Sequence, residues 1–209
     1  MTHQDVLLLR EQVGAILLGT IFCFVGLVAF AVAAIRRRRE FLVILWFGCF
    51  VGMYGMHLLA QATSVLSTTG SSWPDRVDVF VTYMLVVPYI LFWVELTLSR
   101  LRRFFWWLSG VGFVIGVVGL GYFATTGSRD KTLLLNNLLA IFMLIAVGGI
   151  VAVPKLSRTF LVVQSRVLAV CLSAIAIAAL YYTSSSFLHF RPSRNIEPAA
   201  FALWVFALG

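Results

Sequence analysis

The apolar residues of this chain fall into six long runs that short polar segments separate. The runs cover residues 13–35, 41–66, 77–98, 104–124, 133–153 and 167–187, and each is 21 to 26 residues long. A helix rises about 1.5 Å per residue, so about 20 apolar residues cross the 30 Å hydrocarbon core of a bilayer. Each run therefore predicts one membrane-spanning helix.

A seventh apolar segment begins at Pro198 and covers residues 198–209. Proline is favoured at the first helical position, and Asn195 and Glu197 suit the capping and the dipole of a helix N-terminus. The segment is shorter than the roughly 20 residues that a crossing needs. We expect an incomplete seventh helix, with a cytoplasmic output domain after residue 209.

The composition agrees with a membrane location. Hydrophobic residues make up 61% of the 209 positions, charged residues 11%, and the mean hydropathy is +1.00. Soluble domains are about half apolar and a quarter charged. Because the connecting segments are too short to hold a soluble domain, residues 1–209 are predicted to form one all-α transmembrane bundle whose main partner is the lipid bilayer.

The positive charges predict an orientation. The first, third and fifth connections carry ten Lys and Arg residues, against six in the N-terminal tail and the even connections. Lys and Arg are concentrated in cytoplasmic loops, so the N-terminus is predicted to lie outside, with the Arg cluster at 36–39 inside. No Lys/Arg stripe alternates with exposed aromatic residues, so no nucleic-acid surface is expected.

Several polar residues from different runs fall at one predicted depth. His57 lies about 24 Å above the inner face, and Tyr83 and Asn136 lie about 9 Å and about 5 Å below the outer face. Asn137 and Tyr181 belong to the same outer third. Two interpretations stand: an outward-facing ligand pocket, or hydrogen bonds that only hold helices together.

If these five residues bind a ligand, it enters from outside. No buried carboxylate or arginine is apparent at that depth, so we expect a neutral or weakly polar small molecule. Histidine changes charge between pH 5 and pH 8, so a response through His57 would depend on pH.

Enzymatic chemistry has no visible basis in this chain. It contains no motif for hydrolysis, phosphate binding or metal binding, and we expect no catalytic residue, metal or cofactor. Cys23, Cys49 and Cys171 sit in separate apolar runs and are predicted to be small buried hydrophobes. Glu95 lies about 27 Å from the outer face, close to three arginines, and is predicted to pair with one of them.

Glycine spacing and one proline predict details of packing. Gly48 and Gly52 in one run, and Gly112 and Gly116 in another, are four residues apart, a spacing that lets helix backbones approach closely. Both an intramolecular contact and a homodimer contact fit this spacing. Pro88 lies in the middle of the third run and predicts a kink there.

The block "RRRREFLVILWFGCFVGMYGMHLLAQ" joins a basic turn to a glycine- and aromatic-rich helix. It resembles the N-terminal membrane sensor of bacterial multi-domain signalling proteins, the seven-helix receptors with diverse intracellular signalling modules. The ending "EPAAFALWVFALG" is similar to the last helix of such sensors.

The resemblance implies a multi-pass protein of the bacterial inner membrane that regulates a phosphatase or a kinase. Its output would be a serine/threonine phosphatase of the sporulation stage II E type or a histidine kinase, so the full-length protein would be the enzyme. The competing hypothesis is a small-molecule transporter subunit or a membrane-embedded enzyme. Reading the gene beyond Gly209 distinguishes the two.

Overall fold

The computed structural model describes residues 3–36, 41–66, 73–96, 99–128, 130–152 and 201–202, and its elements are all helices. They are α1 (His3–Arg36), α2 (Leu42–Leu66), α3 (Trp73–Met84), α4 (Val86–Leu96), α5 (Ser99–Thr126) and α6 (Asp130–Ala152). Four described spans are long and apolar enough to cross a membrane: Gln12–Arg36, Leu42–Ala62, Trp73–Leu96 and Leu101–Thr126. The chain is thus an all-α protein with helices suited to a bilayer.

The predicted runs match these helices best where the sequence is apolar throughout. The run 41–66 matches α2 within one residue, whereas α1 begins ten residues before the predicted run 13–35. The helix α5 begins five residues before the run 104–124, so the arginines expected in a loop lie on its first turns. The run 167–187 and most of 198–209 lie outside the described residues, and seven crossings with an outside N-terminus stay a prediction.

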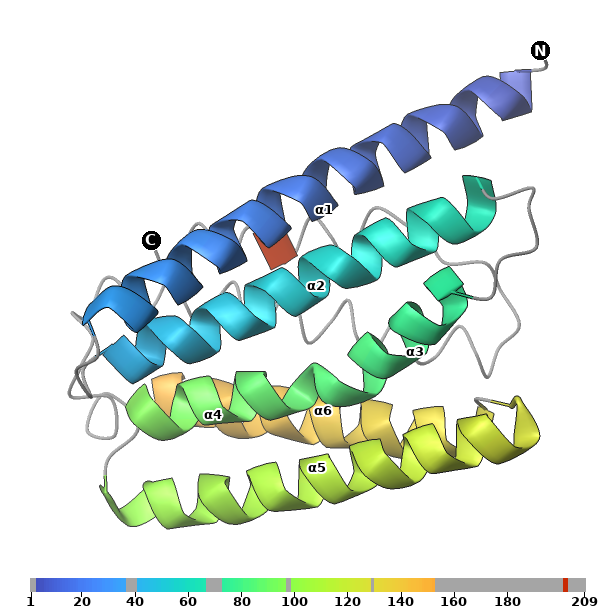
Figure 1. The fold of residues 1–209 in the computed structure, drawn as a ribbon. Coiled ribbons are helices and arrows are strands. Elements are labelled where there is room, and N and C mark those ends of the chain that lie inside the picture. The colour runs from blue at the N-terminus through green and yellow to red at the C-terminus, as the bar shows by residue number, and fades with distance from the viewer. Residues whose placement is uncertain are drawn as a thin grey trace.

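The run 77–98 is not one continuous helix, because it is interrupted at Leu85 between α3 and α4. Pro88 has no N–H to donate to the carbonyl of Met84, and its ring crowds that carbonyl. The backbone amide of Leu85 still donates to the carbonyl of Val81 over 2.8 Å. The outcome is a bend, visible where α3 and α4 change direction in Figure 1, and the predicted kink is confirmed.

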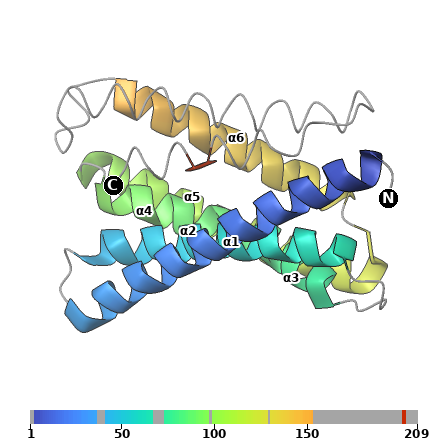
Figure 2. The same ribbon diagram turned by 90° about the horizontal axis from the view of Figure 1, so that it is seen from above.

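The helix α4 lies at the centre of the described bundle. It packs against α2, α5 and, more lightly, α6, and its side chains from Ile90 to Val94 are all buried. A helix that is apolar all round belongs in a core. Viewed from above, α1 crosses α2, and α6 lies on the other side of α4 and α5 (Figure 2).

Glycines bring α1 and α2 into backbone contact. A Cβ atom added to Gly26 would lie 2.6 Å from the Cα of Gly52, and one added to Gly55 would lie 2.6 Å from the backbone nitrogen of Cys23. Neither approach leaves room for a side chain. The glycine spacing of α2 therefore serves packing within the chain.

The glycines of α5 face the bend between α3 and α4. A Cβ atom at Gly116 would lie 3.0 Å from the carbonyl oxygen of Tyr83, and one at Gly119 would lie 2.5 Å from the Tyr83 ring. At Gly112 the added atom would meet Leu139 and Ile90 at ordinary contact distance. The intramolecular interpretation is confirmed for these glycines.

Phe201 belongs to the aromatic core between α1 and α2. Its ring stacks on Tyr54 with centroids 3.8 Å apart and contacts Phe22 and Phe50 at 5.1 and 5.3 Å. Residues 201–202 are helical. Because Phe201 is buried among these rings, this part of the seventh predicted segment lies inside the bundle.

Candidate functional site

An ionisable pair joins α2 to α3. The ring nitrogen Nδ1 of His57 lies 2.8 Å from the carboxylate oxygen Oδ1 of Asp78, and both side chains are largely buried. The other ring nitrogen, Nε2, lies 3.0 Å from the amide nitrogen of Gln61, one turn further along α2. An amide nitrogen can only donate, so in this arrangement Nε2 accepts and the ring proton sits on Nδ1. The approach of Nδ1 to Oδ1 of Asp78 is close, but it lacks the geometry of a hydrogen bond.

This tautomer gives Gln61 a role in the charge state of the ring. A second proton on Nε2 would face the Gln61 amide nitrogen, which accepts no hydrogen bond. Protonation of His57 would therefore favour a turned Gln61 amide that presents its oxygen to the ring. The same step would convert the contact with Asp78 into a full ion pair.

The polar contacts continue from α3 to α6. The Thr82 hydroxyl donates to the backbone carbonyl of Asp78 over 2.7 Å, and the Asn136 side-chain amide donates to the carbonyl of Thr82 over 3.1 Å. The Tyr83 hydroxyl forms a hydrogen bond with the hydroxyl of Thr132. These contacts centre on α3 and connect it to α2 and α6. We call the residues that make them the polar layer: His57, Asp78, Thr82, Tyr83 and Asn136.

Of the five site residues predicted from the sequence, the polar layer contains His57, Tyr83 and Asn136. They come from the three helices α2, α3 and α6. Asn137 is partly buried, and it forms no hydrogen bond or ion pair with the layer among the described residues. Tyr181 lies outside the described residues.

Among the described residues, only one of the two polar atoms of the Asn136 side chain forms a hydrogen bond. Its side chain is 3% exposed, and while its nitrogen donates to Thr82, its oxygen Oδ1 has no hydrogen-bond partner within the described part of the chain. An unmet buried acceptor costs about 1–3 kcal/mol. The polar layer therefore has an acceptor to offer to a donor group.

Asp78 is the member that the sequence did not reveal, and it corrects an expectation. The site was predicted to lack a buried carboxylate, yet this carboxylate contacts His57 directly. Asp78 lies near the start of the run 77–98, where a polar residue is ordinary at a membrane surface. A preference for neutral ligands therefore loses its basis, since a donor or cation has a carboxylate to meet.

Glu95 is confirmed as the partner of an arginine. Both of its carboxylate oxygens accept hydrogen bonds from Nη2 of Arg102, each over 3.1 Å. The pair joins the end of α4 to the second turn of α5, away from the polar layer. Its position and partner indicate a structural role.

The described residues do not form a metal site. No group of three His, Cys, Asp or Glu side chains there lies close enough to hold a metal ion. Cys23 and Cys49 are free and partly buried, and the thiol of Cys23 faces the backbone carbonyl of Gly52 across the helix crossing.

Comparisons with known proteins do not assign this chain to a family. No protein-family model, curated protein or solved structure matches the chain.

Proposed function

We propose that this chain is a membrane-embedded sensor module that passes a signal to a cytoplasmic phosphatase or kinase domain and has no catalysis of its own. The observation that carries the proposal is the contact between His57 and Asp78, which ties α2 to α3 next to a bend. The resemblance of the block around residues 36–61 to bacterial sensor regions supports it.

The His57–Asp78 pair is suited to sense a proton or a ligand with a polar group. Ionisable residues inside a membrane are expensive and are usually kept for function. The attraction between His57 and Asp78 depends on the charge on the ring, and histidine is the side chain that proteins commonly use as a proton-sensitive switch. The oxygen Oδ1 of Asn136, which has no hydrogen-bond partner among the described residues, adds a second point at which a donor group could bind.

The bend supplies a way to transmit the input. The polar layer holds α3 to α2 and α6, whereas α4 is packed into the apolar core. A change in the hold on α3 is therefore expected to alter its angle to α4 at Leu85. Hinge motion at a few residues at the ends of helices is a recurrent form of conformational switching.

Electron paramagnetic resonance tests this input. Spin labels are placed at Arg76→Cys on α3 and Val111→Cys on α5, in a chain whose three native cysteines are replaced by alanine, reconstituted in nanodiscs. The distance between the labels is expected to shift between pH 5 and pH 8. His57→Gln should abolish the shift, while His3→Gln, the same change ahead of the spanning part of α1, should leave it. A shift that survives His57→Gln would refute His57 as the input group.

The output is tested separately. A gene that continues beyond codon 209 into a phosphatase or kinase domain agrees with the proposal, and a different domain or a stop codon contradicts it.

A proton-coupled transporter is the second candidate, and the same pair favours it, since intramembrane acidic and histidine side chains also form proton relays. Liposomes loaded with a pH-sensitive dye distinguish the two. Proton uptake that Asp78→Asn abolishes would support transport, whereas a pH-dependent change of distance without proton flux supports a sensor.

A further inference from the structure

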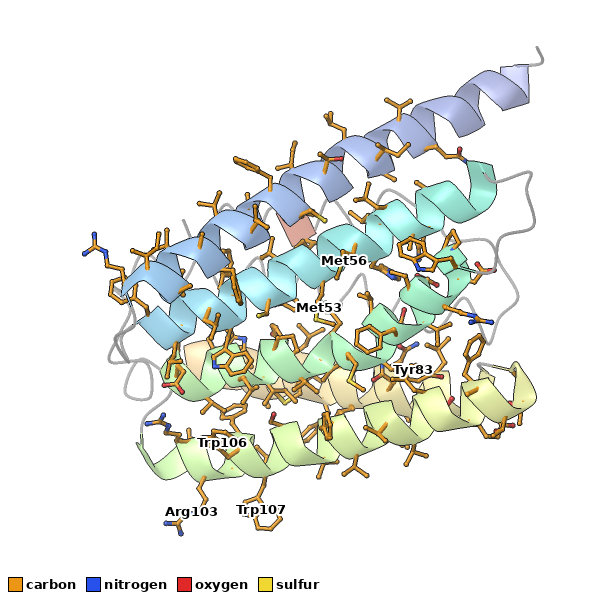
Figure 3. All side chains as sticks on the ribbon, in the orientation of Figure 1. Met53, Met56, Tyr83, Arg103, Trp106 and Trp107 are labelled. Carbon is orange, nitrogen blue, oxygen red and sulfur yellow. The ribbon has the colours of Figure 1, made fainter. Side chains whose placement is uncertain are left out.

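The outer face of α5 begins with one arginine and two tryptophans. Arg103, Trp106 and Trp107 are spaced at i, i+3 and i+4, which places them on one side of the helix. Trp106 is 55% and Trp107 75% exposed. Figure 3 shows Arg103 and Trp107 pointing away from the other described helices.

The charge at this end of α5 is not balanced within the described residues. Arg102 is paired with Glu95, whereas Arg103 is exposed and forms no ion pair with a described acidic residue. The nearby helix N-terminus adds partial positive charge, which makes arginine unfavourable there unless an anion is close. The Arg103 guanidinium is thus left to an anion from outside the described chain.

Beyond the tryptophans the same face becomes smooth and apolar. A Cβ atom added to Gly110 would meet nothing within 4 Å, and Val114, one turn further, is exposed. From Arg103 to Val114 the helix rises about 16 Å, roughly half of the hydrocarbon core and so the depth of a single leaflet. The face therefore has a cationic residue at one end, two aromatic residues next to it, and an exposed apolar surface beyond them.

We propose that this face, formed by Arg103, Trp106, Trp107, Gly110 and Val114, binds a phospholipid with an anionic head group. The Arg103 guanidinium donates to the phosphate in the forked geometry that arginine favours. The tryptophans lie at the head-group level, where their rings and indole N–H groups are both accommodated. An acyl chain runs along Gly110 and Val114.

Charge favours a lipid over a second copy of the chain. An interface related by two-fold symmetry would place this unbalanced arginine on both sides of one contact. An anionic head group complements the charge instead. The proposal concerns a different surface from the polar layer and does not depend on the proposed function.

Native mass spectrometry of the purified protein with defined lipids tests the proposal. Phosphatidylglycerol is expected to stay bound in preference to phosphatidylcholine. Arg103→Gln should lower that preference roughly fivefold, the effect of one arginine near an anionic surface, and Arg103→Lys should restore part of it. Arg76→Gln, which removes an exposed arginine near the opposite end of the bundle, is the matched control.

Quenching of tryptophan fluorescence by brominated acyl chains gives a second readout that needs no change at Arg103. Brominated phosphatidylglycerol should quench more strongly than brominated phosphatidylcholine, and Trp107→Leu should remove most of the difference. Equal retention of the two lipids, an equal effect of Arg76→Gln, or displacement of the lipid by inorganic phosphate alone would overturn the proposal. So would a disulfide between two Trp107→Cys copies that forms whatever lipid is present.

Discussion

The ring of Phe201 stacks on the ring of Tyr54, with centroids 3.8 Å apart and planes 24° from parallel. These residues are separated by most of the chain, yet they meet in the aromatic core beside Phe22 and Phe50. The contact fixes the end of the described chain to α2, and the stability of the bundle should depend on it.

Phe201→Ala is expected to destabilise the protein by about 2 kcal/mol or more, because it removes three aromatic contacts worth about 0.5–1.5 kcal/mol each. Thermal unfolding in detergent measures the change. Phe142→Ala on α6 is the control, since that side chain is 50% exposed and its loss should be small. Similar effects from the two variants would contradict a core position for Phe201.

Gly55→Ala should weaken the contact between α1 and α2. The new methyl group would lie 2.6 Å from the Cys23 backbone nitrogen, and overpacking of this kind costs about 1–3 kcal/mol. Gly14→Ala meets nothing within 4 Å and is expected to be neutral or to stabilise by up to about 1 kcal/mol, the gain in helix propensity. Thermal unfolding of both variants gives the comparison, and a tolerated Gly55→Ala would refute the close approach.

His57 and Asp78 should be energetically coupled. A double-mutant cycle with His57→Gln and Asp78→Asn is expected to give a coupling of about 0.5–3 kcal/mol, the range for residues in direct contact. Chemical unfolding of the original chain, the two single variants and the double variant measures it, and additive effects would show that the contact contributes nothing.

Pro88→Ala should straighten the helix at Leu85. Proline kinks commonly exceed 20°, and from Leu85 to Arg76 the helix rises about 14 Å, so the labelled end of α3 should move by about 5 Å. The spin-label pair at positions 76 and 111 reports the movement. Pro74→Ala is the control, because a proline in the first turn of a helix removes no helical hydrogen bond. An unchanged distance in Pro88→Ala would mean that packing alone maintains the bend.

The sequence predicts the apolar part of the fold well and the rest less well, and particular residues show why. Hydropathy locates α2 within one residue because its apolar run and its helix coincide. It misses the first turns of α1, since "HQDVLLLREQ" is helical while being too polar for a membrane. Apolarity reports the bilayer, whereas helix boundaries also follow propensity and capping.

The polar layer shows the same division. Depth along each run brings His57, Tyr83 and Asn136 to one level, because the rise per residue is fixed. Depth carries no information about which helix faces meet, so the sequence alone does not identify Asp78 as the partner of His57. The pairing of Glu95 with Arg102 could be predicted because the two are only seven residues apart.

The glycine contact between α1 and α2 also bears on how the protein is made. Among the described helices α1 packs chiefly against α2, and both halves of that contact have been synthesised once residue 66 is reached. N-terminal units generally fold first as a chain is translated. The two helices therefore form a hairpin that can enter the bilayer as a finished unit, and the later helices assemble on a surface that is already in place.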